Sequence, residues 1–462
     1  MKYDVAVIGS GPGGYLAASM LCKEGLNVAV IEKNMLGGEC TNWGCIPSKA
    51  LIEAGHLLFL KKAAKHAGIT MEITQLNKKR LMTWVRSASL RSREGIKLLL
   101  REASIIKGTA KLLSPNKIRV VGDEGSVEDI SAEKIIIATG TEPAPVPGFT
   151  FDGKNIIHNR DLFELDELPN SIVIIGGGAI GTELAFALAN VGVEVHLVEI
   201  TDRVLPFLDS EMSYLVSKYL KKDGVKLYTS SEAKFMEKKN GEVSVAIITQ
   251  GEKKEVKVEK VLIAAGRRFT TKSLGLENAG VETAENGAII VNEEMRTTIP
   301  TIFAVGDVTG PPFLAHKAYW QAVIASETIL KGTSPNVSAP IPTVIYSDPE
   351  IGYVGLSEKQ AMDLGKEIKI VKFPYTALPR DYTVMRRTPE GFAKLIFEKK
   401  TGRILGAAII GNQASEVIHI FSLAIAAKMT ANDLKNTIYA HPTYSELARE
   451  LAFAALGKGL HG

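Results

Sequence analysis

A strand, glycine turn, helix and strand occur in succession twice in this chain, and this repeat constrains the fold more than any other feature. The copies are YDVAVIGSGPGGYLAASMLCKEGLNVAVIE and SIVIIGGGAIGTELAFALANVGVEVHLVE. Each carries three glycines and a terminal acid: Gly9, Gly11, Gly14 and Glu32 in the first, and Gly176, Gly178, Gly181 and Glu199 in the second. Every member of the second set lies 167 positions after its counterpart. Because chance matches do not preserve spacing at four points, we predict two α/β units of the dinucleotide-binding type.

The residue types in this repeat suit the binding of a pyrophosphate. The first glycine permits a tight turn, the second lets the backbone approach the phosphates, and the third lets helix pack on strand. The helix N-terminus offers free N–H groups, and the acid can accept hydrogen bonds from ribose hydroxyls. Glycines that serve packing alone are the alternative, which the preserved spacing disfavours. Two such units indicate two cofactors, and a tightly held FAD with an exchangeable nicotinamide fits best.

Glu199 also indicates which nicotinamide the second unit binds. An acid on the adenosine ribose favours a free 2′-hydroxyl and repels a 2′-phosphate, so NAD is expected in preference to NADP. Arg203, four residues later, points weakly the other way; alone, such a residue is more typical of the surface.

Length and composition are those of an ordinary globular protein with several domains. The chain has 462 residues, of which 45% are hydrophobic and 23% charged, and its formal charge is +4. Its length predicts about three domains. No run approaches the roughly 18 apolar residues of a membrane span, and the chain opens on a strand-like segment in place of a signal peptide. We therefore expect a cytoplasmic protein that is not associated with a membrane.

The most basic stretch, from Lys78 to Arg101, alternates basic and apolar residues at helical spacing. This pattern is typical of the solvated face of one or two helices. A nucleic-acid surface would add a recognition motif or interleaved aromatic residues. Neither is present, so no nucleic-acid partner is predicted.

Two of the three cysteines stand in a segment that points to redox chemistry. Cys22 falls in a helical pattern and is predicted to be a small core residue. Cys40 and Cys45 have four residues between them in GGECTNWGCIPSKALIEAG. A closed zinc site needs about four ligands, which scattered histidines and no further cysteine do not supply, so no metal site is predicted. A reversible disulfide fits better: one thiolate attacks a substrate disulfide and the other exchanges electrons with a flavin, with Lys49 stabilising negative charge nearby.

A base for this chemistry is predicted near the C-terminus, in AHPTYSELARE. Histidine is the side chain that titrates nearest neutrality, and His441 is followed five residues later by Glu446, which could orient the imidazole. A lone histidine is usually structural. Pro442, which restricts the backbone, and the nearby acid are the features that single out this one.

Together these motifs resemble the two-dinucleotide-domain flavoprotein disulfide reductases, the class I pyridine nucleotide-disulfide oxidoreductases, over essentially the whole chain. GSGPGGYLAA and GGECTNWGCIPSKAL resemble the family's FAD turn and redox segment, KGTA its adenine contact, and IIIATGTEP its first domain-crossing segment. GGGAIGTE and AAGRR resemble its NAD motifs, and TIFAVGDV, LAHKA and HPTYSE its flavin-contacting and acid–base segments. Within the family, the chain looks most like members that oxidise protein-bound dihydrolipoamide to lipoamide with NAD+.

The resemblance implies a role for each matching position. Cys40 would be the interchange thiol and Cys45 the flavin-proximal thiol, while Lys49 would pair with Glu183 near flavin N5. His441, oriented by Glu446, would accept a proton in the active site of the other subunit, which implies an obligate homodimer. The implied FAD-binding residues are Gly9, Gly11, Gly14, Glu32, Lys33, Gly38, Lys49, Ala110, Thr139, Gly140, Asp307 and Ala315. The implied NAD-binding residues are Gly176, Gly178, Ala179, Ile180, Gly181, Glu199, Gly266 and Arg267.

The predicted fold class is α/β, with two Rossmann-like FAD- and NAD-binding domains in a glutathione-reductase-like arrangement and a C-terminal α+β dimerisation domain. The FAD domain is expected to be discontinuous, comprising residues 1–142 and 269–335, with the NAD domain, 143–268, inserted between them. Residues 336–462 form the interface domain, with strands at IPTVIYS, FAKLIFEKK and RILGAAIIG and a helix in SEVIHIFSLAIAAKM. The apolar run 418–429 is expected to be core or subunit interface.

Several positions depart from the family's usual pattern, and they leave the disulfide substrate open. They are Trp43, Arg268, Phe269, Gln321, Ala322 and the segment 373–384. The alternatives are a glutathione-, coenzyme A- or mercuric-reductase-like enzyme, or a mainly structural subunit of a multienzyme complex. Beyond a second copy, the implied partner is a lipoyl-bearing acyltransferase of a 2-oxo acid dehydrogenase complex or the lipoyl protein of glycine cleavage.

Overall fold

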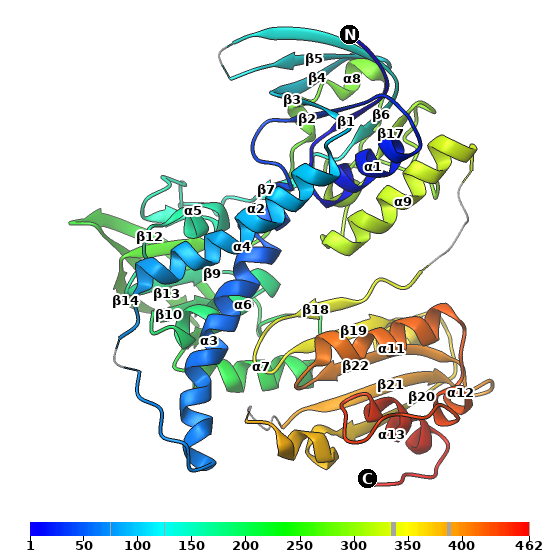
Figure 1. The fold of residues 1–462 in the computed structure, drawn as a ribbon. Coiled ribbons are helices and arrows are strands. Elements are labelled where there is room, and N and C mark those ends of the chain that lie inside the picture. The colour runs from blue at the N-terminus through cyan, green and yellow to red at the C-terminus, as the bar shows by residue number, and fades with distance from the viewer. Residues whose placement is uncertain (74, 124, 334–338, 386–389, 462) are drawn as a thin grey trace.

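Three units, each built around its own main sheet, lie beside one another in the computed structural model (Figure 1). The structure describes residues 1–73, 75–123, 125–333, 339–385 and 390–461. Within that part of the chain, no helix is both long and apolar enough to cross a membrane. The α/β class predicted from the repeat is confirmed.

The first unit holds a sheet in the order β3-β2-β1-β6-β5-β4, with β17 paired to β6. Strands β1, β2, β3, β6 and β17 pair in parallel, whereas β4, β5 and β6 form an antiparallel meander. The strands are β1 Lys2–Ile8, β2 Val28–Glu32, β3 Ser104–Lys107, β4 Thr109–Ser114, β5 Lys117–Val121, β6 Val127–Ile137 and β17 Ile302–Ala304. The helices are α1 Pro12–Lys23, α8 Leu276–Ala279 and α9 Ala315–Lys331. Because β17 comes from far along the chain, this unit is built from two separate stretches of sequence.

Burial on both faces explains why the central strands of the first unit are almost wholly apolar. Along β1, Val5 and Val7 belong to one core cluster, which includes residues of α1 and α9. Ala6 and Ile8 point the other way, into a cluster that includes residues of β4 and β5. Alternate residues therefore fill two cores, as expected for a parallel sheet covered on both sides.

The second unit repeats the parallel arrangement of the first. Its sheet has the order β11-β10-β9-β15-β8. Strands β11, β10, β9 and β15 occupy the same places in it as β3, β2, β1 and β6 in the first sheet. The strands are β8 Ile156–Ile157, β9 Ser171–Ile175, β10 Glu194–Val198, β11 Lys226–Tyr228 and β15 Lys260–Ile263, and an antiparallel sheet of β12 Ser231–Lys239, β13 Glu242–Thr249 and β14 Glu252–Val258 lies beside them. The helices are α5 Asn159–Glu164, α6 Ala179–Asn190 and α7 Ser210–Lys222.

The first two units are joined by a small antiparallel sheet. It pairs β7, Thr141–Pro143, with β16, Arg267–Phe269. These are the outgoing and returning segments that the sequence places at the edges of the inserted domain. The pairing supports the proposed boundaries near 142 and 269.

The third unit is an antiparallel sheet in the order β18-β19-β22-β21-β20, with helices packed on it (Figure 1). The strands are β18 Thr343–Ile345, β19 Ile351–Gly355, β20 Ile368–Pro374, β21 Phe392–Glu398 and β22 Ile404–Ile410. The helices are α10 Glu358–Asp363, α11 Ala414–Ala426, α12 Ala431–Lys435 and α13 Glu446–Ala455. The three predicted strands and the predicted helix are present. The proposed boundary between 335 and 336 lies outside the described residues.

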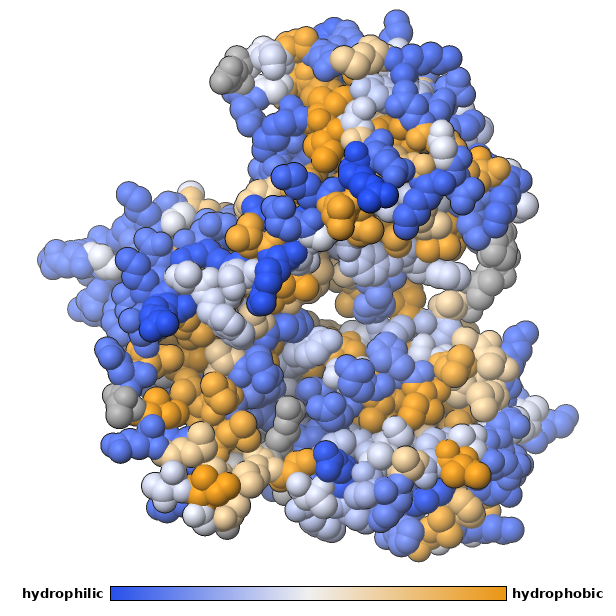
Figure 2. All heavy atoms as spheres, in the orientation of Figure 1, coloured by the Kyte–Doolittle hydropathy of each residue, from blue (hydrophilic) through white to orange (hydrophobic). Residues whose placement is uncertain are grey.

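The apolar run 418–429 divides its side chains between core and surface. Ile418 and Phe421 of α11 are fully buried, whereas Leu423 is 68% exposed. Ile438, which follows α12, is 96% exposed. Figure 2 shows apolar side chains gathered over parts of the third unit and around α3, where Leu57 is also exposed. Such exposed apolar residues are typical of a surface that another chain covers.

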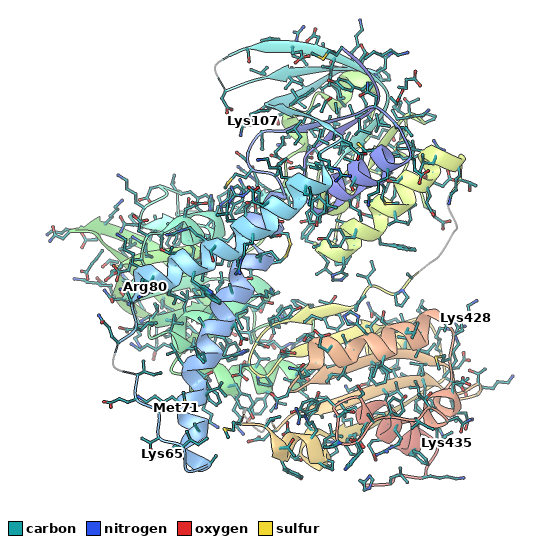
Figure 3. All side chains as sticks on the ribbon, viewed as in Figure 1. Lys65, Met71, Arg80, Lys107, Lys428 and Lys435 are labelled. Carbon is teal, nitrogen blue, oxygen red and sulfur yellow. A yellow bond between two sulfur atoms is a disulfide. The ribbon has the colours of Figure 1, made fainter. Side chains whose placement is uncertain are left out.

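Three helices carry the redox segment and its continuation: α2 Gly38–Trp43, α3 Cys45–His66 and α4 Lys78–Leu99. Helix α3 packs against α6 of the second unit and against α4. Leu81, Met82 and Val85 bury one side of α4, while Arg80 near its start is exposed (Figure 3). The basic stretch therefore forms the solvated face of a helix, as its spacing predicts.

Candidate active site

A disulfide joins Cys40, in the last turn of α2, to Cys45, the first residue of α3. The two Cα atoms are 4.7 Å apart. Gly44 makes the turn between the helices possible, because a Cβ there would lie 3.1 Å from the Glu39 carbonyl oxygen and 3.2 Å from Cys40 Cα. The predicted disulfide is thus present, and the remaining cysteine, Cys22, is buried and unpaired as expected.

The position of Cys45 favours a thiolate when the disulfide opens. The N-terminus of a helix carries partial positive charge, which stabilises an anion there and lowers the pKa of a thiol. Helix α3 is 22 residues long, and Cys45 opens it. Lys49 follows one turn later on the same face, since residues four apart are neighbours on a helix surface.

The predicted pair of Lys49 and Glu183 is formed, and a third residue completes it. Lys49 Nζ lies 2.8 Å from Glu183 Oε2. The backbone N–H of Tyr346 donates to Glu183 Oε1 at 2.9 Å, and Lys49 Nζ lies 4.5 Å from the centre of the Tyr346 ring. Burial raises the pKa of Tyr346. The three residues come from α3, from α6 of the second unit and from the segment after β18 of the third unit. The redox segment therefore meets both the second and the third unit at this ion pair.

The glycine turn of the first unit forms a cradle that larger residues would fill. Gly9 has φ of +98°, and a Cβ on Gly14 would lie 1.9 Å from the Gly9 carbonyl oxygen. A Cβ on Gly38 would lie 2.7 Å from Gly11 Cα, so the α2 N-terminus also closes on the turn. Glu32 accepts hydrogen bonds from Ser10 N at 2.9 Å, Ser10 Oγ at 2.7 Å and Asn34 N at 2.8 Å. This arrangement fits the pyrophosphate and ribose of a dinucleotide.

The remaining proposed FAD residues cluster at the carboxyl ends of β6 and β17 or at the edge of the sheet. Thr139 and Gly140 follow β6, and the Thr139 hydroxyl is buried without a hydrogen-bond partner among the described residues. Asp307 follows β17 and accepts from Thr141 Oγ1 at 3.3 Å. Burial raises the pKa of Asp307, although Arg267 and Lys317 oppose this. Ala315 opens α9, Ala110 is buried in β4, and Lys33 is exposed just after β2.

Parallel strands meet their ligands at their carboxyl ends, where a cofactor would lie between β1, β6 and β17. The unpartnered Thr139 hydroxyl and the space left by the glycines therefore fit a flavin dinucleotide.

The second unit has the same glycine turn and a matching acid beside it. Gly176 has φ of +110°, and a Cβ on Gly181 would again lie 1.9 Å from the carbonyl oxygen of the first glycine. Glu199 accepts from Gly177 N at 2.6 Å, Thr201 N at 2.8 Å and Thr201 Oγ1 at 2.7 Å. The two acids therefore occupy matching places beside matching turns.

The residues around the second turn differ in solvent exposure and in their contacts. Ala179 and Ile180 begin α6, and Ile180 is 41% exposed. Gly266, with φ of +135°, leads into Arg267, which donates to Thr141 Oγ1 at 2.6 Å and Thr141 O at 2.8 Å. Arg203 is partly exposed, and its guanidinium lies 3.4 Å from Asp202 and donates to the Pro206 carbonyl at 3.4 Å. Arg203 is thus engaged with a neighbouring acid in the structure.

The predicted acid–base pair is formed in the turn that leads into α13. His441 Nδ1 lies 3.0 Å and 3.2 Å from the two carboxylate oxygens of Glu446. Glu446 is buried and also accepts from Thr443 N at 2.9 Å and Arg449 Nη2 at 3.0 Å. Burial raises the pKa of Glu446, but the hydrogen bonds from Thr443 and His441 outweigh it, so the pKa is lowered overall. The carboxylate therefore holds the imidazole while the His441 side chain stays 63% exposed.

Within the described part of the chain, the acid–base pair and the disulfide belong to different regions. The hydrogen-bond partners of His441 and Glu446 are all in the third unit. Figure 1 shows α13 on the far side of that unit from α2. The predicted site residues therefore form two groups, which the chain holds apart.

Most of the positions that depart from the family pattern have structural partners. Gln321 Oε1 accepts from Gly306 N at 2.8 Å, so it holds the turn that carries Asp307. Trp43 Nε1 donates to Glu164 Oε1 at 2.7 Å, and Arg268 pairs with Glu142 at 2.7 Å across β7 and β16. Ala322 is fully buried in the core under α9.

Sequence reasoning did not predict three contacts of the site: Tyr346 with Glu183, Gln321 with Gly306, and Arg267 with Thr141. Tyr346 meets Glu183 across 163 residues and Gln321 meets Gly306 across 15, through contacts of the folded chain. Tyr346 falls inside the predicted strand IPTVIYS and lies directly after β18 in the structure, and a place in a strand does not identify a partner.

Two family models match the chain in succession. One, described as pyridine nucleotide-disulphide oxidoreductase, matches residues 3–322. The other, described as the dimerisation domain of the same family, matches residues 341–452. The first two units thus correspond to the first model and the third unit to the second.

Curated relatives and solved structures are similar over nearly the whole chain. Dihydrolipoyl dehydrogenase of Bacillus subtilis is 40% identical, covering 100% of this chain and 98% of the relative. The same enzyme of Geobacillus stearothermophilus is 39% identical with the same coverage. The structure of the HOCl-induced flavoprotein disulfide reductase RclA from Escherichia coli superposes with a TM-score of 0.85 at 30% identity, covering 97% and 99% of the two chains. That of LpdA from Mycobacterium tuberculosis has a TM-score of 0.89 at 26% identity, covering 98% and 99%.

Proposed function

The chain belongs to the pyridine nucleotide-disulphide oxidoreductase family, and from this premise we propose that it is a dihydrolipoyl dehydrogenase. It oxidises protein-bound dihydrolipoamide to lipoamide and reduces NAD+. The observation that carries the proposal is the Cys40–Cys45 disulfide at the start of α3, one turn from the Lys49–Glu183 pair and between two dinucleotide cradles. Full-length relatives with this activity in their names support the choice of substrate.

The cofactors are FAD in the first unit and NAD in the second. Gly9, Gly11 and Gly14 would hold the FAD pyrophosphate, and Glu32 would accept hydrogen bonds from its ribose hydroxyls. When bound, FAD supplies the passage of an electron pair between the disulfide and the nicotinamide. Glu199 would accept hydrogen bonds from the ribose of NAD in the same way, and its charge would disfavour a 2′-phosphate.

The sulfur chemistry is carried by groups of the chain. His441 takes a proton from one thiol of dihydrolipoamide, and the resulting thiolate attacks Cys40 Sγ and breaks the Cys40–Cys45 bond. A mixed disulfide with Cys40 forms, and Cys45 leaves as a thiolate at the helix N-terminus near Lys49. His441 then gives its proton to the departing Cys40 sulfur and takes the proton of the second substrate thiol. The sulfur of that second thiol attacks the substrate sulfur of the mixed disulfide, which releases lipoamide and leaves Cys40 as a thiol. Glu446 keeps the imidazole oriented throughout.

A homodimer completes this site. Residues 341–452 match a dimerisation domain, and the third unit exposes Leu423 and Ile438. We propose that His441 and Glu446 of one chain face Cys40 and Cys45 of the partner. The division into an FAD domain of 1–142 and 269–335, an NAD domain of 143–268 and an interface domain of 336–462 belongs to the same proposal.

The physiological dithiol is proposed to be carried by another protein. A lipoyl-bearing acyltransferase of a 2-oxo acid dehydrogenase complex, or the lipoyl protein of glycine cleavage, would present it. The relatives' names specify a dihydrolipoyl group and leave its carrier open.

A substrate comparison tests the proposal. Turnover is measured with dihydrolipoamide and NAD+ or NADP+, and in reverse with lipoamide, glutathione disulfide and coenzyme A disulfide, each with NADH and NADPH. We expect the lipoyl pair with NAD to give the highest kcat/KM. A preference for glutathione or coenzyme A disulfide would move the enzyme to another branch of the family, and a preference for NADPH would contradict the role of Glu199.

A further inference from the structure

A buried polar cluster lies under the turn that carries the acid–base pair. Its members are Tyr375, Asp381, Asn412 and Tyr444. Asp381 belongs to the 3₁₀ helix Pro379–Thr383, inside the segment 373–384 that departs from the family pattern. Asp381 and Tyr375 are 1% and 0% exposed, so this acid lies in the protein interior.

One carboxylate oxygen of Asp381 joins three parts of the third unit. Asp381 Oδ1 accepts from Tyr444 Oη at 3.0 Å and from Asn412 Nδ2 at 2.8 Å. Tyr375 Oη donates to the Asn412 carbonyl at 2.7 Å, and the Tyr375 ring stacks on that of Tyr444 with centroids 5.6 Å apart. Both tyrosines therefore donate a buried hydroxyl, but only Tyr444 stands in the His441–Glu446 turn.

Tyr444 lies two residues before the start of α13. Its carbonyl accepts from Leu447 N, in the first turn of the helix, at 3.1 Å, and Glu446 is two residues along. Glu446 in turn accepts from Thr443 N at 2.9 Å and faces His441. If the Tyr444 side chain moves, the backbone that aims Glu446 at the imidazole moves with it.

Keeping an acid in this interior is costly, which indicates a positional role. An ionised carboxylate loses its hydration on burial, and burial raises the pKa of Asp381. Asp381 Oδ2 has no hydrogen-bond partner among the described residues. The acid thus contributes through Oδ1 alone, as a fixed acceptor for Tyr444 and Asn412.

We propose that Asp381 and Tyr444 are positioning residues for the acid–base pair. The bond between the Tyr444 hydroxyl and the Asp381 carboxylate anchors the turn, so that Glu446 meets His441 Nδ1 and the ring is presented to the partner's disulfide. The inference rests on the proposed function for the role of His441. The anchoring itself depends on the geometry of the third unit.

Paired tyrosine variants of the holoenzyme provide the test. Tyr444→Phe and Tyr375→Phe each remove one buried hydroxyl from the same stacked pair, so they are matched for packing. In Tyr444→Phe we expect kcat for dihydrolipoamide oxidation to fall about 10- to 100-fold, as displaced catalytic groups do, while the rate at which NADH reduces the enzyme is unchanged. In Tyr375→Phe we expect kcat to stay within about twofold of wild type, even where the loss of thermal stability equals that of Tyr444→Phe.

A second pair of variants guards against a folding effect. Asp381→Asn keeps Oδ1 and should keep kcat, whereas Asp381→Leu removes the acceptor and should behave like Tyr444→Phe. The ring signals of His441 in protein labelled at histidine, assigned with His441→Gln, report the anchoring without any substrate. They should shift or broaden in Tyr444→Phe and Asp381→Leu and stay unchanged in Tyr375→Phe and Asp381→Asn.

Equal loss of turnover in the two tyrosine variants, or unchanged His441 signals in Tyr444→Phe, would overturn the inference. A wild-type enzyme without lipoyl activity whose His441 signals respond as expected would instead refute the proposed function and leave the anchoring intact.

Discussion

Tyr346 shows how a residue with no chemistry of its own can control one that has it. Its ring lies against Lys49 and its backbone N–H binds Glu183, so it holds both members of the ion pair. An ammonium over an aromatic face is stabilised by about 0.5–2 kcal/mol. The ring therefore limits where the Lys49 charge can lie relative to Cys45.

Replacing Tyr346 separates the contribution of its ring from that of its backbone. Both Tyr346→Phe and Tyr346→Leu keep the N–H bond to Glu183, but only the phenyl ring keeps the contact with Lys49. We expect the charge-transfer absorbance between the Cys45 thiolate and FAD, measured after two-electron reduction, to persist in the phenylalanine variant and to weaken in the leucine variant. Equal spectra would show that the ring does not position Lys49.

The disulfide makes a sharper prediction. Cys45→Ser removes the leaving thiolate, so turnover of dihydrolipoamide should fall at least about 1,000-fold, in keeping with loss of a covalent catalyst. Binding of NADH, followed by quenching of flavin fluorescence, should be unaffected because the NAD cradle is separate. Near-normal turnover by this variant would refute the mechanism.

At the residue scale, the sequence identified groups that a short motif or a family pattern places. Cys40 with Cys45 and His441 with Glu446 are five positions apart, and their pairing is present in the structure. Lys49 and Glu183 are 134 positions apart and were paired through the family resemblance. Tyr346, Asp381 and Gln321 were not predicted as partners, because such contacts follow from packing between segments and leave no local periodicity.

At the scale of elements, the glycine turns were the most predictable part of the fold. Their spacing, the strand before and the helix after are local, and both units have the expected order. The antiparallel sheet β12–β14 and the crossing pair β7–β16 were not foreseen as sheets. Their registers depend on the turn geometry and on partners elsewhere in the chain.

Two glycines of the second turn should fail in different ways. A Cβ on Gly181 would lie 1.9 Å from a backbone oxygen, whereas a Cβ on Gly178 meets nothing within 4 Å. Gly181→Ala should therefore lower the thermal midpoint and raise KM for NAD+. Gly178→Ala should leave the midpoint unchanged and still raise KM, because its methyl enters the space of the pyrophosphate. An unaffected KM in Gly178→Ala would contradict the placement of the cofactor.

At the scale of the whole molecule, charged side chains fasten the third unit to the second. Lys394 of β21 is only 4% exposed and lies 2.5 Å from Asp209, which precedes α7. Lys218 of α7 meets Glu390 at 2.5 Å in a much more exposed pair. Helix α7 follows the loop beyond Glu199, so these contacts connect the NAD cradle to the unit that carries His441.

Burial predicts that these two pairs differ in importance. Lys394→Ala leaves the partly exposed Asp209 and Glu358 without the lysine between them, which should cost about 2 kcal/mol and lower the thermal midpoint by about 2–4 °C. Lys218→Ala breaks an exposed pair and should shift it by less than about 1 °C. Scanning calorimetry of the holoenzyme compares them, and similar shifts would show that burial does not decide the outcome.

The separation between His441 and the redox disulfide within one chain has a genetic consequence. Cells that make only Cys45→Ser chains or only His441→Gln chains should have no working enzyme. Cells that make both should recover some activity. In the proposed homodimer, a mixed pair has one site that carries both substitutions and one site that carries neither. With random pairing and equal synthesis, about a quarter of normal activity returns. Two alleles that are null alone would then complement each other, although neither chain can be repaired.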